Sequence, residues 1–263
     1  MPDLAVFDRH VSRYMSTEVH AARLESSMEA IARTMHTYGI SGVPILDDDD
    51  WLTGVVTRTD LIRLGVVQAG RRSASPVMPL PHRRAKDVMT NQPLTVASSS
   101  SIRAAARQMI EHSVHRLFVR DGERLTGVLA AIDLTRVVRD SGIERELSTI
   151  MTAPVVTIDI RTPIGAATEQ IERLRITQLI VTDEGQPVGV FSQADALAVR
   201  ELPRGTPLEV VYDAAVLCLP ATTKLCRAAA HVADLDVRRV VVCKEREAIG
   251  IATALDFARF VAL

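Results

Sequence analysis

A seven-residue motif that occurs four times constrains the fold of this chain more than any other feature. Each copy reads Gly, two apolar residues, usually Thr or Ser, two variable residues and Asp. The copies are Gly54–Asp60, Gly127–Asp133, Gly189–Asp195 and Gly250–Asp256. An apolar run precedes each copy and a helix-like run follows it. The motif therefore marks a strand that passes into the first turn of a helix.

The motif is the last part of a longer repeat. Its aspartates lie 44 residues, and in the first copy 45 residues, after an opening residue, which is Met15, Met89, Met151 or Tyr212. We place the extra residue of the first copy in the acidic turn Asp47–Asp50. Each unit reads strand, helix, strand, strand, helix, and repetition at this length indicates copies of one structural unit. The sequence thus predicts a mixed α/β (α+β) fold of four βαββα repeats.

The hydroxyl and the carboxylate of each motif have two interpretations. Thr57 stands where a helix begins, so its hydroxyl could cap that helix, and Asp60 could complete a capping box. The same end of a helix favours phosphate, and a carboxylate can accept hydrogen bonds from ribose hydroxyls, so the pair could also hold a nucleotide. All four copies keep Asp, whereas capping boxes prefer Glu or Gln. This favours the nucleotide, and a capped helix start remains an anion site.

Two further signatures accompany the motifs. Three repeats open with Met followed by Ser or Thr, and the first contains Gly39-Ile-Ser-Gly-Val-Pro44. In combination, these features resemble cystathionine-β-synthase (CBS) domains over about residues 11–263. The resemblance implies that the repeats pack pairwise into two Bateman modules. The clefts of such modules commonly hold adenosine nucleotides or S-adenosylmethionine.

The resemblance and the spacing together suggest domain boundaries. We expect an N-terminal extension, 1–14, whose apolar side chains Val6, Phe7, Val11 and Tyr14 pad a subunit contact or, as we prefer, cap the core. The first pair spans 15–140, with repeat 1 at 15–65, repeat 2 at 86–140 and a linker at 66–85. The second pair spans 147–263, with repeat 3 at 147–201 and repeat 4 at 208–263. The linker is rich in proline, serine and arginine, including Arg71 and Arg72, which favours an exposed segment.

Candidate ligand-binding residues follow from the motif and from its neighbours in the family pattern. They are Thr57, Asp60, Thr95, Arg116, Asp133, Thr157, Ser192, Asp195, Arg239, Thr253 and Asp256. Arginines at the start of a second strand, including Arg238, can lean toward a phosphate, with a surface ion pair as the alternative. Two departures weaken individual sites. Ala130 replaces the hydroxyl residue of repeat 2, and the irregular stretch Val19–Ala22 replaces the regular first strand of repeat 1.

Charge and composition argue against several classes of function. The formal net charge is −1, which gives no global attraction to nucleic acid or acidic membranes. No apolar run approaches the ~20 residues of a membrane helix, and the first residues lack a signal-peptide pattern, so we expect a cytoplasmic protein. Cys218, Cys226 and Cys243 match no zinc spacing and are interpreted as reduced core residues. His112 and His115 straddle a helix end, where we expect helix-end chemistry and no metal site.

Our leading hypothesis is a regulatory module that binds AMP, ADP, ATP or S-adenosylmethionine and requires no cofactor. Four repeats occupy the chain, so we expect a regulated partner in trans and a homodimer, with no nucleic-acid partner. We expect no enzyme, because the sequence has no catalytic triad order, P-loop or metal cluster. The alternative is a dimerisation scaffold with degenerate nucleotide sites, which Ala130 favours for the first pair.

Overall fold

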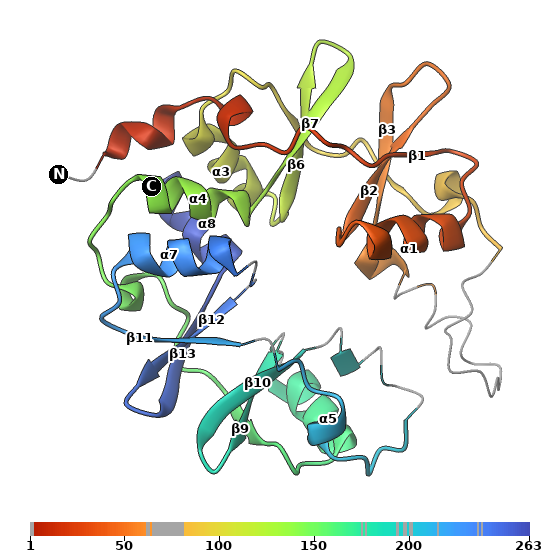
Figure 1. Cartoon of the computed structure of the whole chain (residues 1–263). Coiled ribbons are helices and arrows are strands. Elements are labelled where there is room, and N and C mark those ends of the chain that lie inside the picture. Colours follow the sequence, from red (N-terminus) through yellow and green to blue (C-terminus); the bar gives the residue numbers. More distant parts are fainter. Residues whose placement is uncertain are drawn as a thin grey trace. The chain divides into compact units, whose positions relative to one another are not determined.

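The computed structural model confirms the predicted mixed α/β fold of four repeats, each built on a small sheet (Figure 1). It describes residues 3–263 except 62–63, 65–81, 175, 177, 193–194, 197–198, 200–201, 215, 236 and 238. Most of the predicted linker, including Arg71 and Arg72, therefore lies outside the described residues, as does Arg238. The chain divides into two compact units. The larger comprises Met1–Met15, Ser99–Arg116 and Leu129–Leu263, and the smaller comprises Ser16–Ser98 and Leu117–Val128.

The described elements of the repeats share the order strand, helix, strand, strand, and a final helix is described in repeats 2 and 4. Repeat 1 contains β1 (Ala22–Arg23), α1 (Met28–Thr37), β2 (Gly42–Leu46) and β3 (Leu52–Thr57). Repeat 2 contains β4 (Thr90–Asn91), β5 (Thr95–Val96), α3 (Ile102–Glu111), β6 (Arg116–Asp121), β7 (Arg124–Ala130) and α4 (Asp133–Asp140). Repeat 3 contains β8 (Thr157–Asp159), α5 (Ile164–Leu174), β9 (Gln178–Asp183) and β10 (Gln186–Ser192). Repeat 4 contains β11 (Leu217–Pro220), α7 (Leu225–Asp234), β12 (Arg239–Lys244), β13 (Glu247–Thr253) and α8 (Ala254–Ala262).

The strands pair in the same way in each repeat. The first strand lies parallel to the second, as β8 does to β9, and the second lies antiparallel to the third, as β9 does to β10. Ile45 of repeat 1 pairs with Gly54, just as Val181 of repeat 3 pairs with Gly189. The extra residue of repeat 1 therefore lies in the hairpin turn between β2 and β3, as predicted.

The opening residues of each repeat pair with the third strand of the other repeat in its pair. The paired residues are Ser16 with Val128, Thr90 with Val55, Thr152 with Ile251, and Asp213 with Val190. Repeats 1 and 2 exchange their openings in this way, and so do repeats 3 and 4. This exchange confirms that the repeats pack pairwise.

The exchange also explains the glycine of the motif. A Cβ atom on Gly250 would lie 2.4 Å from Sδ of Met151, the opening residue of repeat 3. A Cβ atom on Gly189 would lie 2.1 Å from the ring of Tyr212, the opening residue of repeat 4. The motif glycine and the opening residue are thus two sides of one contact between paired repeats.

A short 3-10 helix precedes each opening residue and packs against the first helix of the paired repeat. These helices are η2 (Val11–Arg13), η3 (Ala85–Asp87), η4 (Leu147–Thr149) and η5 (Leu208–Val210). Each begins with a fully buried apolar residue four positions before the opening residue. In repeat 3, for example, the Leu147 N–H donates to the carbonyl of Thr223, just before α7.

The N-terminal extension continues the same packing. It contains η1 (Leu4–Asp8), and its apolar residues Val6, Phe7, Val11 and Tyr14 are all buried. Phe7 packs edge-to-face on Phe260 of α8, with ring centroids 6.0 Å apart. The structure thus confirms that the extension caps a core.

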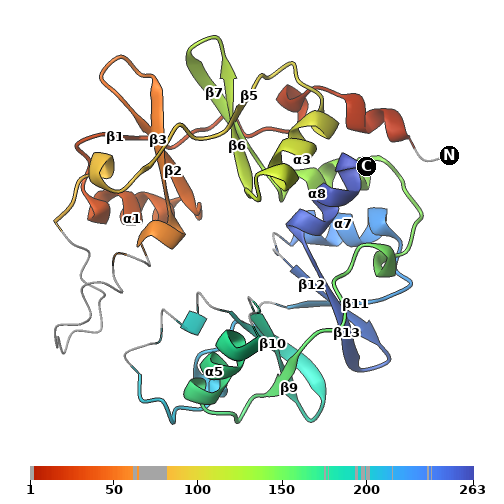
Figure 2. The same ribbon diagram turned by 180° about the vertical axis from the view of Figure 1, so that it is seen from behind.

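Helices of repeats 2 and 4 form one cluster within the larger unit. The four helices α3, α4, α7 and α8 lie side by side, with α3 and α4 packed against α8 and α4 also packed against α7 (Figure 1; Figure 2). Their buried faces contain small residues such as Ala105, Ala106, Ala228 and Ala229. Small side chains allow the helix axes to approach closely.

Candidate functional site

The motif aspartates all accept a hydrogen bond at the start of the helix that follows. Oδ2 of each aspartate accepts from the backbone N–H three residues earlier, at 2.7–2.8 Å, in all four repeats. The hydroxyls of Thr57, Ser192 and Thr253 donate to the same oxygen at 2.6, 2.6 and 2.8 Å. Ala130 has no hydroxyl, so repeat 2 keeps only the backbone bond. The motif therefore forms capping boxes, which was the first of its two interpretations.

The capping bonds leave one carboxylate oxygen for other contacts. Each capping bond uses Oδ2, so Oδ1 decides what else the aspartate can hold. The four aspartates themselves differ in burial: Asp256 is only 4% exposed, whereas Asp60, Asp133 and Asp195 are half-buried. A capped helix start still offers unpaired backbone N–H groups and partial positive charge to an anion.

Repeat 4 brings an arginine to this helix start. Arg239 is the first residue of β12, and in the strand register it stands directly opposite Thr253, which is the N-cap of α8. Nη1 of Arg239 is buried and has no hydrogen-bond partner among the described residues. A buried guanidinium nitrogen without a partner is costly. An anionic group at this position would satisfy it, which fits the predicted role of Arg239.

The remaining candidates lie on the strands that flank the motif. Thr157 is exposed on β8, and Thr95 is half-buried on β5, where it pairs with Phe118. Arg116 is half-buried at the start of β6, and both Thr95 and Arg116 have interaction partners of their own. The structure thus groups Arg239 with Thr253 and Asp256, while the ligand roles of Thr95, Thr157 and Arg116 stay predictions.

Repeat 1 has a feature that the sequence did not predict. The ring of His20 stacks on that of Tyr38, with centroids 3.4 Å apart and planes 12° from parallel. His20 precedes the short first strand β1, and Tyr38 directly follows helix α1. The ring of Tyr38 therefore already covers one face of the His20 imidazole, where a purine base would otherwise have to stack.

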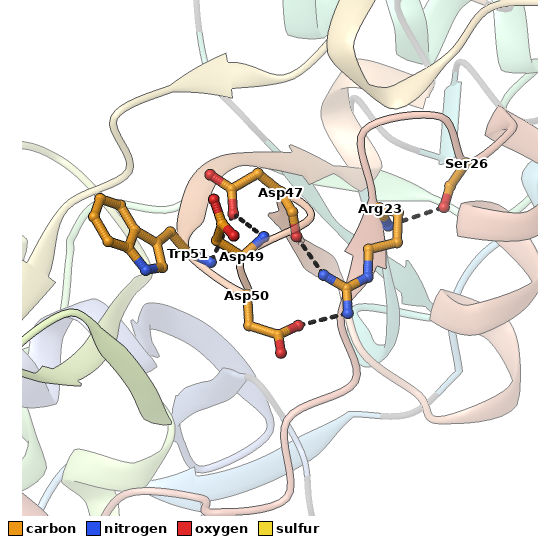
Figure 3. A network of polar contacts seen from close by, with 6 residues as sticks. All are labelled: Arg23, Ser26, Asp47, Asp49, Asp50 and Trp51. Atoms are coloured by element: carbon orange, nitrogen blue, oxygen red, sulfur yellow. Dashed lines mark hydrogen bonds and ion pairs between the residues drawn. The ribbon is translucent and has the colours of Figure 1, made fainter.

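The acidic turn of repeat 1 has its own internal bonds (Figure 3). Oδ1 of Asp47 accepts from the backbone N–H groups of Asp49 and Trp51, at 3.1 and 2.9 Å. Arg23 donates to the carbonyl of Asp47 and forms an ion pair with Asp50. The turn is thus an exposed, arginine-paired hairpin tip.

The histidines and cysteines belong to no metal-binding group in the described part of the chain, where no three His, Cys, Asp or Glu side chains gather closely enough. The cysteines are all free thiols. The prediction that they are core residues is wrong for Cys218, which is exposed because it alternates along β11 with the half-buried Leu217 and Leu219 and so lies on the outer face of the strand. Burial, together with the neighbouring Cys218, raises the pKa of Cys243 to about 12.

Two residues close to the motif were not among the site residues predicted from the sequence. Arg136 and Arg259 each lie three residues after a motif aspartate, on α4 and α8, and form an ion pair with it. The signal was present, because residues three apart on a helix are neighbours.

Comparison with known proteins places the chain among proteins of similar length and fold. A crystal structure of protein MJ1225 from Methanocaldococcus jannaschii is 16% identical, with a TM-score of 0.76 over 95% of this chain and 99% of that one. A conserved protein from Pyrococcus horikoshii is 17% identical, with a TM-score of 0.67 over 96% of this chain and 99% of that one. At such low identity the likeness supports the fold alone.

Curated relatives match over shorter stretches. A 33.4 kDa protein encoded in a ribosomal RNA operon of Thermofilum pendens is 24% identical over 204 residues, which is 72% of this chain and 63% of the relative. The chain therefore spans less than two thirds of that relative. The family model for the CBS domain matches residues 11–66, 85–140 and 147–201. Repeat 4 lies outside these segments but has the same order of elements. Since the matched segments cover well over half of the sequence, the chain belongs to the CBS domain family.

Proposed function

We propose that this protein is a stand-alone regulatory module that binds an adenosine-type ligand between paired repeats and signals to a protein partner in trans. The observation that carries the proposal is the buried Nη1 of Arg239, which lies opposite the helix start at Thr253 and has no partner within the described ranges of the chain. Such a nitrogen is costly to leave without a partner, and a bound anion would satisfy it. Membership of the CBS family supports an adenosine compound as the ligand that bears this anionic group.

In this proposal the phosphate lies against Arg239 and the N-terminus of α8, and the ribose hydroxyls donate to a motif aspartate. Arginine suits phosphate because its planar group donates two parallel hydrogen bonds. AMP, ADP and ATP are favoured over S-adenosylmethionine, since their phosphates carry more negative charge than its single carboxylate, which a sulfonium and an ammonium group accompany. We expect the ligand to be bound and released unchanged, so the protein is not an enzyme.

The first test measures AMP binding by calorimetry to the wild type and to Arg239→Gln. We expect the substitution to weaken AMP at least tenfold, since a charge-assisted bond to phosphate contributes about 1.5–3 kcal/mol. Arg246 is the matched control, because it is exposed in the turn between β12 and β13. Arg246→Gln should leave AMP affinity unchanged. Equal affinity of Arg239→Gln and the wild type would contradict the proposal, as would no rise in melting temperature with any adenosine compound.

A second candidate function is a structural scaffold, which the internal satisfaction of the capping boxes favours. Each motif aspartate is already hydrogen-bonded without a ligand. A scaffold would keep one oligomeric state with and without nucleotide, whereas a sensor requires two states with different ligand affinity. Sedimentation with and without AMP separates the two.

The oligomeric state, the protein partner and the cellular location are further parts of this proposal. We expect a homodimer that acts on a separate protein in the cytoplasm, with no membrane and no nucleic acid involved. Among the described residues, no helix has the length and apolar character that a membrane crossing requires.

A further inference from the structure

The first two strands of repeat 4 bring two cysteines together. β11 lies parallel to β12, and Cys218 stands directly opposite Val241 in their register (Figure 1). Cys243 follows two residues after Val241, and side chains two apart on a strand share a face of the sheet. The two thiols are thus diagonal neighbours on one face, and they lie within hydrogen-bonding reach of each other.

The two thiols differ in their access to solvent. Cys218 is exposed, whereas Cys243 is half-buried, with its sulfur 4.0 Å from the backbone carbonyl of Val241. A small oxidant therefore reaches Cys218 first, and Cys243 is placed to react with the product. The third cysteine, Cys226, lies in the first turn of α7 and provides an internal control.

We propose that Cys218 and Cys243 form an oxidation site, at which a hydroperoxide converts the two thiols into a disulfide between β11 and β12. This oxidation requires no adenosine ligand and is independent of the proposed function.

The reaction has two steps. The Cys218 thiolate attacks an oxygen of the hydroperoxide, the O–O bond breaks, and the other oxygen leaves as an alcohol or as water once it has gained a proton. This step leaves a sulfenic acid on Cys218. The sulfur of Cys243 then attacks the sulfur of Cys218, the S–S bond forms, and the sulfenic hydroxyl leaves with the Cys243 proton as water. Two thiols are oxidised and one hydroperoxide is reduced, so no further reactant is needed.

The electrostatics of the pair assign the two roles. Desolvation raises the pKa of Cys218, and the hydrogen bond with Cys243 partly offsets that rise. Burial raises the pKa of Cys243 to about 12, and the neighbouring Cys218 adds to the rise. Cys218 therefore ionises first and is the attacking sulfur. Because the thiolate is the nucleophile and its pKa lies above neutrality, the rate should increase about tenfold for each pH unit near neutrality.

Formation of the bond requires a small movement of β11. Diagonal neighbours on paired strands have Cα atoms about 7–8 Å apart, whereas a relaxed disulfide spans about 4.4–6.8 Å. β11 is an edge strand that is bonded to β12 on one side, so it can shift more easily than a central strand. A disulfide made in this way is strained, and strained disulfides are reduced readily. We therefore expect the bond to be reversible.

The experiment treats the reduced full chain with hydrogen peroxide, alkylates the remaining thiols and identifies the products by peptide mass spectrometry. We expect a disulfide-linked pair of peptides that contain Cys218 and Cys243, with Cys226 alkylated and the link lost on treatment with dithiothreitol. The rate of linking should rise about tenfold between pH 7 and pH 8.

Two variants sharpen the test, and their melting temperatures check that they fold. Cys226→Ser is the matched control and should form the link at the wild-type rate. Cys243→Ala should form no link and should accumulate sulfenic and sulfinic acid at Cys218, because the second thiol is absent.

Three outcomes would overturn the inference. The first is a wild type in which Cys218 stays reduced or becomes a sulfinic acid without any link. The second is a link from Cys218 to Cys226, or to a second copy of the chain, which a gel without reductant reveals. The third is a rate that does not change between pH 7 and pH 8, which would contradict attack by the Cys218 thiolate. None of these outcomes affects AMP binding, so the proposed function is tested separately.

Discussion

The motif glycine is under a steric constraint whose severity differs between repeats. At Gly189 a Cβ atom would meet the ring of Tyr212 and, at 2.6 Å, the backbone carbonyl of Asp213, and neither can move freely. At Gly250 it would meet Met151, whose thioether is flexible. We therefore expect Gly189→Ala to lower the free energy of unfolding by about 1–3 kcal/mol, the usual cost of overpacking, and Gly250→Ala to cost less.

Urea denaturation of the two variants checks this order. Gly205→Ala is the control, because a Cβ atom there would have no neighbour within 4 Å. It should leave stability unchanged or raise it slightly. A smaller loss for Gly189→Ala than for Gly250→Ala would show that the ring of Tyr212 moves aside easily.

The short 3-10 helices matter more to stability than their length suggests. Leu147 of η4 is fully buried against the start of α7, in the paired repeat. We expect Leu147→Ala to lower the free energy of unfolding by about 2–5 kcal/mol, since it leaves a cavity between two repeats. Val210 of η5 is the matched control, because it is 65% exposed in an element of the same type. Val210→Ala should change the free energy by less than about 0.5 kcal/mol, and equal losses would contradict this role.

Periodicity was enough to predict the elements within each repeat but not the contacts between repeats. The 44-residue spacing predicted four copies, and the extra residue was placed correctly in the turn of repeat 1. The buried residue four positions before each opening was equally regular, as at Leu147 and Leu208, but was not recognised. Its importance depends on the exchange of openings, which is tertiary packing. Likewise, Cys218 has an apolar neighbourhood in sequence, and only the fold decides that its side of β11 is the exposed one.

The candidate site was predictable to the same limited extent. The motif located Thr253 and Asp256, and strand position suggested Arg239. What the sequence could not supply is the state of each polar atom. The buried Nη1 of Arg239, which has no partner in the part of the chain that the structure describes, and the ion pair between Asp256 and Arg259 depend on side-chain geometry in three dimensions.

At the scale of the whole molecule, the helix cluster restricts how copies of the chain could assemble. The faces of α7 and α8 that pack on α3 and α4 are already covered within one chain. The homodimer that we expect must therefore use another surface. A fragment of residues 147–263, by contrast, would expose apolar residues of α7 and α8, including Phe260, that repeat 2 and the N-terminal extension cover in the full chain.

We expect this fragment to self-associate through those helices, because an exposed apolar face of that kind is removed from water by pairing with a second copy. Sedimentation of the fragment over a range of concentrations measures the association. Adding a separate fragment of residues 1–146 should compete with it, since that fragment carries α3, α4 and the N-terminal extension, which cover the same face in the intact chain. A fragment that stays monomeric at every concentration would mean that the packing of α7 and α8 on repeat 2 contributes little to the stability of the whole protein.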